Sequence, residues 1–184
     1  MLKIVTVPNK VLSSSTRRVE KIDEKIKQLI IDMEKTLSAQ KDPKGVGLAA
    51  NQLGENLSLF IIKASERAKI KAFINPRIIS RTVLGTKDSP YKKQKKKRRQ
   101  SVKLEGCLSI PRIWGSVNRA KKILLEYQDL TPGVRKKSFQ GFEATIIQHE
   151  IDHLNGIVFT QRSLEQKQPV YKEEGEELVK VDLS

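Results

Sequence analysis

The chain has 184 residues and a mass of 20.9 kDa, which is enough for one domain with its own hydrophobic core. Its single cysteine excludes an intrachain disulfide, and therefore a disulfide-stapled secreted domain, and indicates a reducing compartment. No apolar run approaches the roughly 20 residues of a membrane span, so we expect a soluble, cytoplasmic protein that does not enter a membrane. The net charge of +15 favours anionic partners such as nucleic acid.

The first predicted element is an amphipathic helix over residues 23–39. Apolar residues recur there at steps of three and four positions, which places them on one face of a helix. Asp23 and Glu24 suit the positive end of a helix, and Asp42-Pro43 stops any continuation. The residues of the apolar face are Ile22, Ile26, Leu29, Ile30, Met33 and Leu37.

The middle of the chain is expected to form short strands between turns. Residues 45–54 are punctuated by glycine and indicate a loop or irregular segment, with a turn at residues 54–56. Six short runs of apolar or β-branched residues predict strands, separated by turn residues such as Asn75-Pro76. These strands cover residues 57–63, 71–75, 78–83, 102–104, 123–127 and 137–139.

A second helix is predicted from Phe142 to about Asn155, and Gly156 is a suitable residue to end it. Residues 157–159 follow as a predicted short strand. The acidic segment 172–177 is expected to be exposed and to lead into a last strand over residues 178–181.

One segment is strongly basic. Seven of the eight residues at positions 92–99 are lysine or arginine. Such a run repels itself, which predicts a mobile loop.

The strongest chemical signal is Gln148-His-Glu-Ile-Asp-His153 in the second predicted helix. His149 and His153 are four residues apart, so a helix stacks both imidazoles on one face, where they can bind one metal ion. Glu150 lies beside the first of them and can act as general base on a water held by the metal. A chance helix with polar residues on one face is the alternative explanation.

A catalytic metal site needs a third protein ligand and a position open to water. The sequence holds no other histidine, and Cys107 is its only cysteine. A thiolate is a good ligand for zinc or ferrous iron, although a lone cysteine is also typical of a small buried hydrophobic residue. Residues 45–52 lack the lysine of a phosphate-binding loop, which argues against nucleotide binding and by itself predicts only a closely packed turn.

Three segments together resemble the peptide deformylase family. They are Gly45-Val-Gly-Leu-Ala-Ala-Asn-Gln52, Glu105-Gly-Cys-Leu-Ser109 and Gln148-His-Glu-Ile-Asp-His153, in the order and spacing of that family. The resemblance extends over about residues 1–160. It implies an α+β fold in which short antiparallel β-sheets pack around a central helix with the His-Glu-x-x-His motif, together with an N-terminal amphipathic helix. It also implies one catalytic domain over residues 1–184, with a tail from about residue 161.

The resemblance further implies a metal-dependent hydrolase that removes the N-formyl group from the formyl-methionine of newly synthesised proteins and releases formate. One divalent ion is expected, with Fe²⁺ favoured and Zn²⁺ or Ni²⁺ also accepted. Glu150 is expected to be the base, and the Gln52 side chain with the backbone N–H of Leu108 to stabilise the oxyanion. The implied metal ligands are Cys107, His149 and His153.

The substrate groove is expected beside this metal. Val46 and Gly106 are expected to pair with an extended peptide like an added strand. Phe142, Thr145 and Ile146 lie one or two helical turns before His149 and are expected to line the methionine slot. The full set of expected substrate contacts is Gly45, Val46, Gly47, Gly106, Phe142, Thr145 and Ile146.

Glu105 and Arg119 match family positions that form an ion pair behind the cysteine loop, where such a pair orients a ligand; two exposed charges are the alternative. The basic insertion of about residues 88–101 and the segment Pro111-Arg-Ile-Trp114 depart from the family pattern and leave the preference beyond formyl-methionine open. The protein is expected to be a monomer that acts on nascent chains, and residues 92–99 can add affinity for the ribosome.

Two other functions stay open from the sequence. A zinc peptidase uses the same helix with a downstream carboxylate as third ligand, for which Glu165, Glu173 and Glu174 are candidates. An RNA-binding protein could use residues 92–99, although Tyr91 is the one aromatic residue beside the run, so base stacking is weakly supported.

Overall fold

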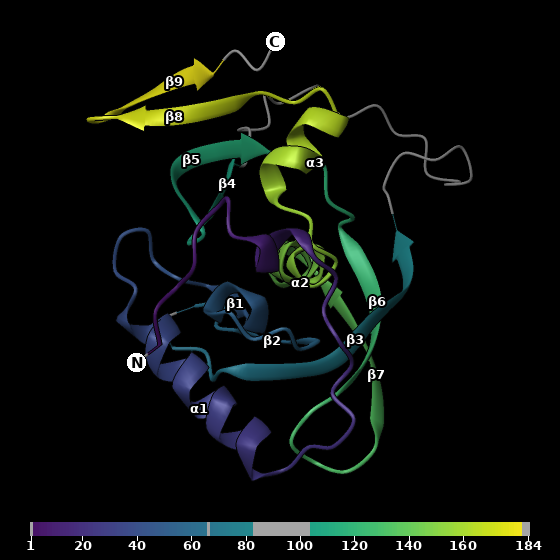
Figure 1. Ribbon diagram of the computed structural model, residues 1–184. Coiled ribbons are helices and arrows are strands. Elements are labelled where there is room, and N and C mark those ends of the chain that lie inside the picture. Colours follow the sequence, from purple (N-terminus) through teal and green to yellow (C-terminus); the bar gives the residue numbers. More distant parts are fainter. Residues whose placement is uncertain (1, 66, 83–103, 182–184) are drawn as a thin grey trace, which may run out of the picture.

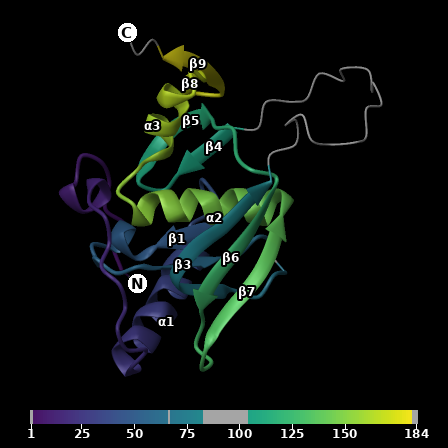
Figure 2. The same cartoon turned by 90° about the vertical axis from the view of Figure 1, so that its right-hand side faces the viewer.

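The computed structural model describes residues 2–65, 67–82 and 104–181. Within them, two antiparallel sheets lie on opposite sides of the central helix α2 (Gly141–Leu154), as Figures 1 and 2 show. This confirms the expected α+β arrangement around the helix that carries the His-Glu-x-x-His motif. No helix in the described part of the chain is long and apolar enough to cross a membrane.

The strands follow two simple orders. The five-stranded sheet runs β1-β2-β3-β6-β7 and the four-stranded sheet runs β4-β5-β8-β9. The strands of the first are β1 (Gly47–Ala49), β2 (Leu59–Ile62), β3 (Lys71–Thr82), β6 (Lys122–Gln128) and β7 (Val134–Gln140). The strands of the second are β4 (Leu104–Cys107), β5 (Ile110–Ser116), β8 (Val170–Glu174) and β9 (Glu177–Val181). The remaining elements are α1 (Glu24–Ala39), α3 (Phe159–Glu165) and the 3-10 turns η1 (Lys10–Ser13) and η2 (Ala50–Leu53).

Helix α1 begins and ends close to the predicted positions. The Asp23 carboxylate accepts a hydrogen bond from the backbone N–H of Ile26 at 3.1 Å, which caps the first turn. Ile26, Ile30, Met33 and Leu37 are buried on one face. The predicted apolar stripe therefore does pack against the fold, on the side of β2 away from α2.

Strand β2 is buried along its whole length because both faces of the sheet are covered there. Phe60 and Ile62 point toward α2, while Leu59 and Ile61 join the cluster around α1. On the α2 side, Phe60 stacks on Phe73 with ring centroids 4.9 Å apart. This two-sided core fixes α2, and with it the paired histidines, over the first sheet.

Some predicted elements were wrong. Residues 45–54 are not a plain loop, because they contain β1 and η2. Residues 157–159 form no strand: Val158 is the cap of α3, and Phe159 is its first residue. The predicted break at Asn75-Pro76 is a bulge inside one continuous strand, β3, where the pairing register with β6 shifts and Asn75 has a φ of 51°.

The second sheet was predicted only at its edges. Strand β4 begins at Leu104 and includes Glu105 and Cys107, whereas the sequence placed these residues after a strand at 102–104; residues 102 and 103 lie outside the described part of the chain. Strand β5 was missed, because proline and glycine residues punctuate it. The last strand, predicted over residues 178–181, is β9. The basic segment 92–99 lies outside the described residues.

Candidate metal centre

The two histidines of α2 meet the cysteine of β4. His149 and His153 are one helical turn apart, with ring centroids 5.0 Å apart. The sulfur of Cys107 lies 3.1 Å from Nε2 of His153. One potential ligand atom from each of the three residues lies within 4.8 Å of the others. A thiolate and two imidazoles in this arrangement fit a divalent transition-metal ion.

Charge at this cluster favours the ligand form of the sulfur. Burial by itself disfavours a thiolate, but the facing rings of His153 and His149 outweigh it and hold the pKa of Cys107 well below its ordinary value. In return, and against the effect of burial, contacts with Cys107 and Glu105 raise the pKa of His149 well above its ordinary value. The lowered pKa of Cys107 favours the thiolate, which is the form in which cysteine binds a metal ion.

Gln52 is oriented toward the cysteine by its own backbone neighbourhood. The N–H of Ala49 donates to its side-chain oxygen at 2.9 Å, which identifies the other end as the amide nitrogen. That nitrogen lies 3.5 Å from the Cys107 sulfur and 3.1 Å from the hydroxyl of Ser109. Gln52 thus presents an N–H donor beside the candidate metal ligands.

Glu150 is a buried carboxylate, and one of its oxygens lacks a hydrogen-bond partner in the described part of the chain. It is 3% exposed, and Oε2 has no hydrogen-bond partner among the described residues. Burial raises the pKa of Glu150 to about 7, a value suited to a group that both accepts and returns a proton near neutral pH. Its carboxylate lies against Gly47, where a side chain would collide with it. The glycine of β1 therefore makes room for this carboxylate.

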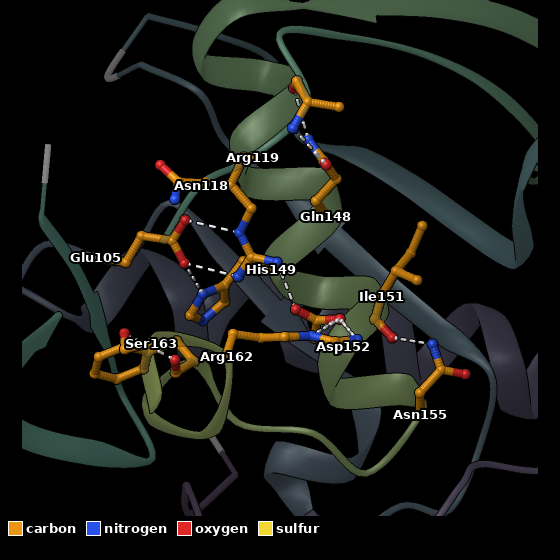
Figure 3. A network of polar contacts seen from close by, with 12 residues as sticks. Glu105, Asn118, Arg119, Gln148, His149, Ile151, Asp152, Asn155, Arg162 and Ser163 are labelled. Carbon is orange, nitrogen blue, oxygen red and sulfur yellow. Dashed lines mark hydrogen bonds and ion pairs between the residues drawn. The ribbon is translucent and has the colours of Figure 1, made fainter. Parts of the chain in front are cut away.

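Glu105 contacts the ring of His149 and the guanidinium of Arg119, as Figure 3 shows. Its Oε2 lies 3.0 Å from Nδ1 of His149, which leaves Nε2 for a metal. Both of its oxygens also accept hydrogen bonds from the Arg119 guanidinium, at 2.9 and 2.8 Å. Arg119 and Glu105 are about one-tenth exposed, so the exposed-charge alternative is wrong. Burial raises the pKa of Glu105, but the hydrogen bonds from Arg119 and His149 outweigh it and lower the value to about 2.

A cavity of about 1290 Å³ opens beside the cluster. It lies between β1, β4 and the first half of α2, and Trp114 of β5 forms part of its wall. All seven residues expected to contact substrate line it, together with Gln52, Cys107, Leu108, His149 and Glu150. The sequence segments that are far apart in the chain therefore converge on one cavity.

The carboxylates proposed for a zinc peptidase lie elsewhere. Glu165 accepts a hydrogen bond from Arg162, Glu173 accepts one from Trp114, and Glu174 pairs with Lys172. None of the three belongs to the cluster with the paired histidines. In the described structure, Cys107 is the residue that lies with both histidines in this cluster.

Asp152 and Arg162 were not identified from the sequence. Asp152 is buried and accepts hydrogen bonds from both Arg119 and Arg162. Its spacing of three residues from His149 places it close to that ring on α2, which is the one signal the sequence offered. Arg162 gave no signal, because α3 was not predicted.

Residues 1–169 match the sequence model of the polypeptide deformylase family. The peptide deformylase of Dictyoglomus turgidum is 34% identical over 166 residues, which cover 90% of this chain and 95% of that protein. That of Desulfotalea psychrophila is 35% identical over 176 residues, covering 94% and 93%.

Solved structures of the family have the same fold. A peptide deformylase from Thermotoga maritima superposes with a TM-score of 0.72 at 31% identity, covering 88% of this chain and 97% of that one. One from Synechococcus elongatus, in complex with actinonin, has a TM-score of 0.72 at 30% identity, covering 90% and 87%. With the cysteine, the paired histidines and the buried glutamate converging on one cavity, the chain belongs to the peptide deformylase family.

Proposed function

We propose that this protein hydrolyses the N-formyl group of formyl-methionine at the N-terminus of newly synthesised proteins and releases formate. The observation that carries the proposal is the meeting of Cys107, His149 and His153 within 4.8 Å, beside the buried carboxylate of Glu150. Family membership supplies the substrate class. A cytoplasmic location follows from the proposal, because nascent chains carry the formyl group there.

The proposed cofactor is one divalent metal ion held by Cys107, His149 and His153. Fe²⁺ is our first choice, and Zn²⁺ or Ni²⁺ also suit one thiolate with two imidazoles. When bound, such an ion lowers the pKa of a water molecule and polarises a carbonyl group. Metal analysis of protein purified without oxygen distinguishes the three ions.

Glu150 is proposed to carry the proton of the reaction. Its carboxylate accepts a proton from the attacking water and returns it to the amine that leaves. A group with a pKa raised by burial can perform both steps near neutral pH, and Glu150 has this property. Its unpartnered oxygen leaves one acceptor free for the water.

The oxyanion is proposed to receive hydrogen bonds from Gln52 and from the backbone N–H of Leu108. Gln52 is held in a fixed orientation by Ala49 and Ser109, so its donor needs no reorganisation during the reaction. Gln52 and Leu108 line the same cavity as Glu150. Glu105 and Arg119 are proposed to orient His149 rather than to contact substrate.

The peptide is proposed to lie along the glycine-rich edge of the cavity. Gly45, Val46 and Gly47 line one side, and Gly106 lies on the other. The methionine side chain is assigned to the part formed by Thr145 and Ile146, with the exposed ring of Phe142 at the rim.

Formate release from a formyl-methionyl peptide tests the function. Glu150→Gln keeps the size of the side chain and removes its basicity, so kcat should fall by about 10²- to 10⁴-fold. Glu150→Ala should lose at least as much. Metal content, measured on the same samples, should stay at one ion per chain. Activity within tenfold of the wild type with metal retained would exclude Glu150 as the base.

Binding to the ribosome is a separate proposal that rests on the charge of residues 92–99, which lie outside the described structure. A deletion of these eight residues should weaken binding to ribosomes and reduce its salt dependence, because fewer counterions are released. The deletion should leave hydrolysis of a short peptide unchanged. Unaltered ribosome binding with an unaltered salt slope would contradict the proposal. We also propose a monomer, which sedimentation of the purified protein tests.

A further inference from the structure

A series of buried ion pairs leads from α3 at the surface to the candidate metal ligand His149 (Figure 3). Arg162 of α3 donates to Oδ1 of Asp152 from Nε at 3.2 Å and from Nη2 at 2.9 Å. The other carboxylate oxygen of Asp152 accepts from Nη1 of Arg119. Arg119 in turn donates to both oxygens of Glu105, which contacts the His149 ring.

Arg162 is the most exposed member of this series. Its side chain is 31% exposed, whereas those of Glu105, Arg119 and Asp152 are at most 10% exposed. The two oxygens of Asp152 are divided between two arginines. Because Arg162 donates to Oδ1, Arg119 needs to donate only one hydrogen bond to Asp152. Its other two donors can therefore keep their bidentate contact with Glu105.

Asp152 needs both arginines for a further reason. It lies in the last turn of α2, where the helix dipole disfavours a negative charge. It is also buried, so removal of Arg162 leaves a carboxylate oxygen without a donor. Arg119 is then attracted toward Asp152 and away from Glu105, which loosens the support of the His149 ring.

Helix α3 is firmly docked, so Arg162 has a defined position. Ser163 is buried, and its hydroxyl donates to the backbone oxygen of Ser116 at 2.9 Å. Phe159 is 1% exposed and packs in the same cluster as Cys107. The helix that carries Arg162 therefore packs beside Cys107 of the candidate metal centre.

We infer that Arg162 is a positioning residue for the metal centre: through Asp152 and Arg119 it fixes Glu105, and thereby the His149 ring. The inference rests on the proposed metal site but not on the identity of the substrate. A purely electrostatic effect of Arg162 on the bound cation would change the release rate in the opposite direction. Removing a positive charge near a cation strengthens its binding, whereas removing a positioning group speeds its release.

The release of Zn²⁺ from the loaded protein to a chromophoric chelator tests the inference without any peptide. Loss of a direct partner of a metal-ligating histidine costs about 10- to 100-fold in metal affinity. Arg162 contacts His149 only through other residues, so a smaller effect is expected. Arg162→Gln should release Zn²⁺ about 3- to 10-fold faster. Arg162→Lys, which keeps the charge, should lie between this variant and the wild type. Release from Arg162→Gln at or below the wild-type rate would overturn the inference.

Glu165→Gln is the matched control, because Glu165 contacts Arg162 on the solvent side only. This variant should release Zn²⁺ within twofold of the wild-type rate. An acceleration as large as that of Arg162→Gln would point to general loosening of α3 and would refute the route through Asp152. The route itself is tested by a double-mutant cycle. In an Asp152→Asn background, Arg162→Gln should add less than twofold, and persistence of its full effect would refute the route.

Activity provides a second readout. With saturating metal, Arg162→Gln should keep KM for a formyl-methionyl peptide within twofold, because Arg162 does not line the cavity. Faster release of Zn²⁺ would support the inference even if no peptide were hydrolysed, so its outcome is separable from that of the proposed function. If Arg162→Gln fails to fold, a wild-type release rate in Arg162→Lys overturns the inference, and a two- to threefold acceleration supports it.

Discussion

Replacing Gly47 with alanine adds one methyl group, and we expect this change to lower the enzymatic activity strongly. Gly47 lies in β1, outside the left-handed region of φ, so alanine is compatible with its backbone. An ideal Cβ at this position would lie 2.2 Å from Oε1 of Glu150 and 2.9 Å from Cγ2 of Ile146. Gly47→Ala therefore forces the carboxylate to move while the metal ligands keep their places.

The size of the displacement follows from the contact distance. Real Cβ contacts are essentially never shorter than 3.0 Å, so Oε1 must retreat by at least about 0.8 Å. Misplacement of a reacting group by about 1 Å can cost about 100-fold in rate. We expect kcat/KM for a formyl-methionyl peptide to fall about 100-fold, with one metal ion per chain retained and about 1–3 kcal/mol of stability lost to overpacking.

The assay follows formate through formate dehydrogenase and compares the variant with Gly115→Ala. A Cβ on Gly115 would lie 2.7 Å from the Ser163 hydroxyl and 2.9 Å from Phe159, so this control is overpacked to a similar degree in the other sheet, away from the carboxylate. It should lose stability but, with saturating metal, keep kcat/KM within about threefold, because its clashes involve α3 and not the carboxylate. Activity of Gly47→Ala within threefold of the wild type would refute the fixed placement of Glu150.

Three further predictions concern charge and packing. In the metal-free protein, Glu150 should titrate near pH 7, because burial disfavours its charge. A bound cation favours that charge and so lowers the pKa of Glu150. The kcat/KM of the loaded enzyme should therefore decline on acidification only below pH 7. Glu105 has a pKa lowered from 4.5 to about 2, so its contribution to stability is present above pH 4.5 and is lost as the pH falls toward 2. The deficit of Glu105→Gln in urea unfolding should therefore shrink between pH 6 and pH 3, and a constant deficit would contradict the ion-pair assignment. Phe73→Ala removes a buried ring that contacts Phe60, Tyr127 and Phe139, and should cost about 3–5 kcal/mol in the free energy of unfolding; a loss below 1 kcal/mol would show that this cluster is not a core.

Local patterns in the sequence were sufficient for the helices. The predicted ranges 23–39 and 142–155 differ by one residue at most from α1 and α2. Both segments have strong stop signals, and α1 also has a clear apolar period. Strands in the two-sided core, such as β2, were also found, because a fully buried strand reads as a short apolar run.

Elements that depend on tertiary contacts were missed. Pro76 indicates a turn when read locally, but β3 accommodates it at a bulge. The apolar residues 157–159 have high strand propensity, yet Phe159 is buried as the first residue of α3. Local propensity does not report such burial.

The candidate site was predictable in its ligands and in the Glu105–Arg119 ion pair behind them, but not in the rest of its support. The spacing of His149 and His153 fixes their common face on any helix, and family motifs identified Cys107. The chain of ion pairs joins Arg119, between β5 and β6, through Asp152 of α2 to Arg162 of α3. No local pattern encodes it, so only the folded structure could reveal it.

The central claim is that one sulfur and two imidazoles hold the same ion, and X-ray absorption of the Zn²⁺-loaded protein tests it most directly. The wild type should show one sulfur at about 2.3 Å and nitrogen ligands at about 2.0–2.1 Å from the metal. Cys107→Ala should lose the sulfur signal. A wild-type spectrum without sulfur, or an unchanged spectrum with one ion per chain in Cys107→Ala, would contradict the account.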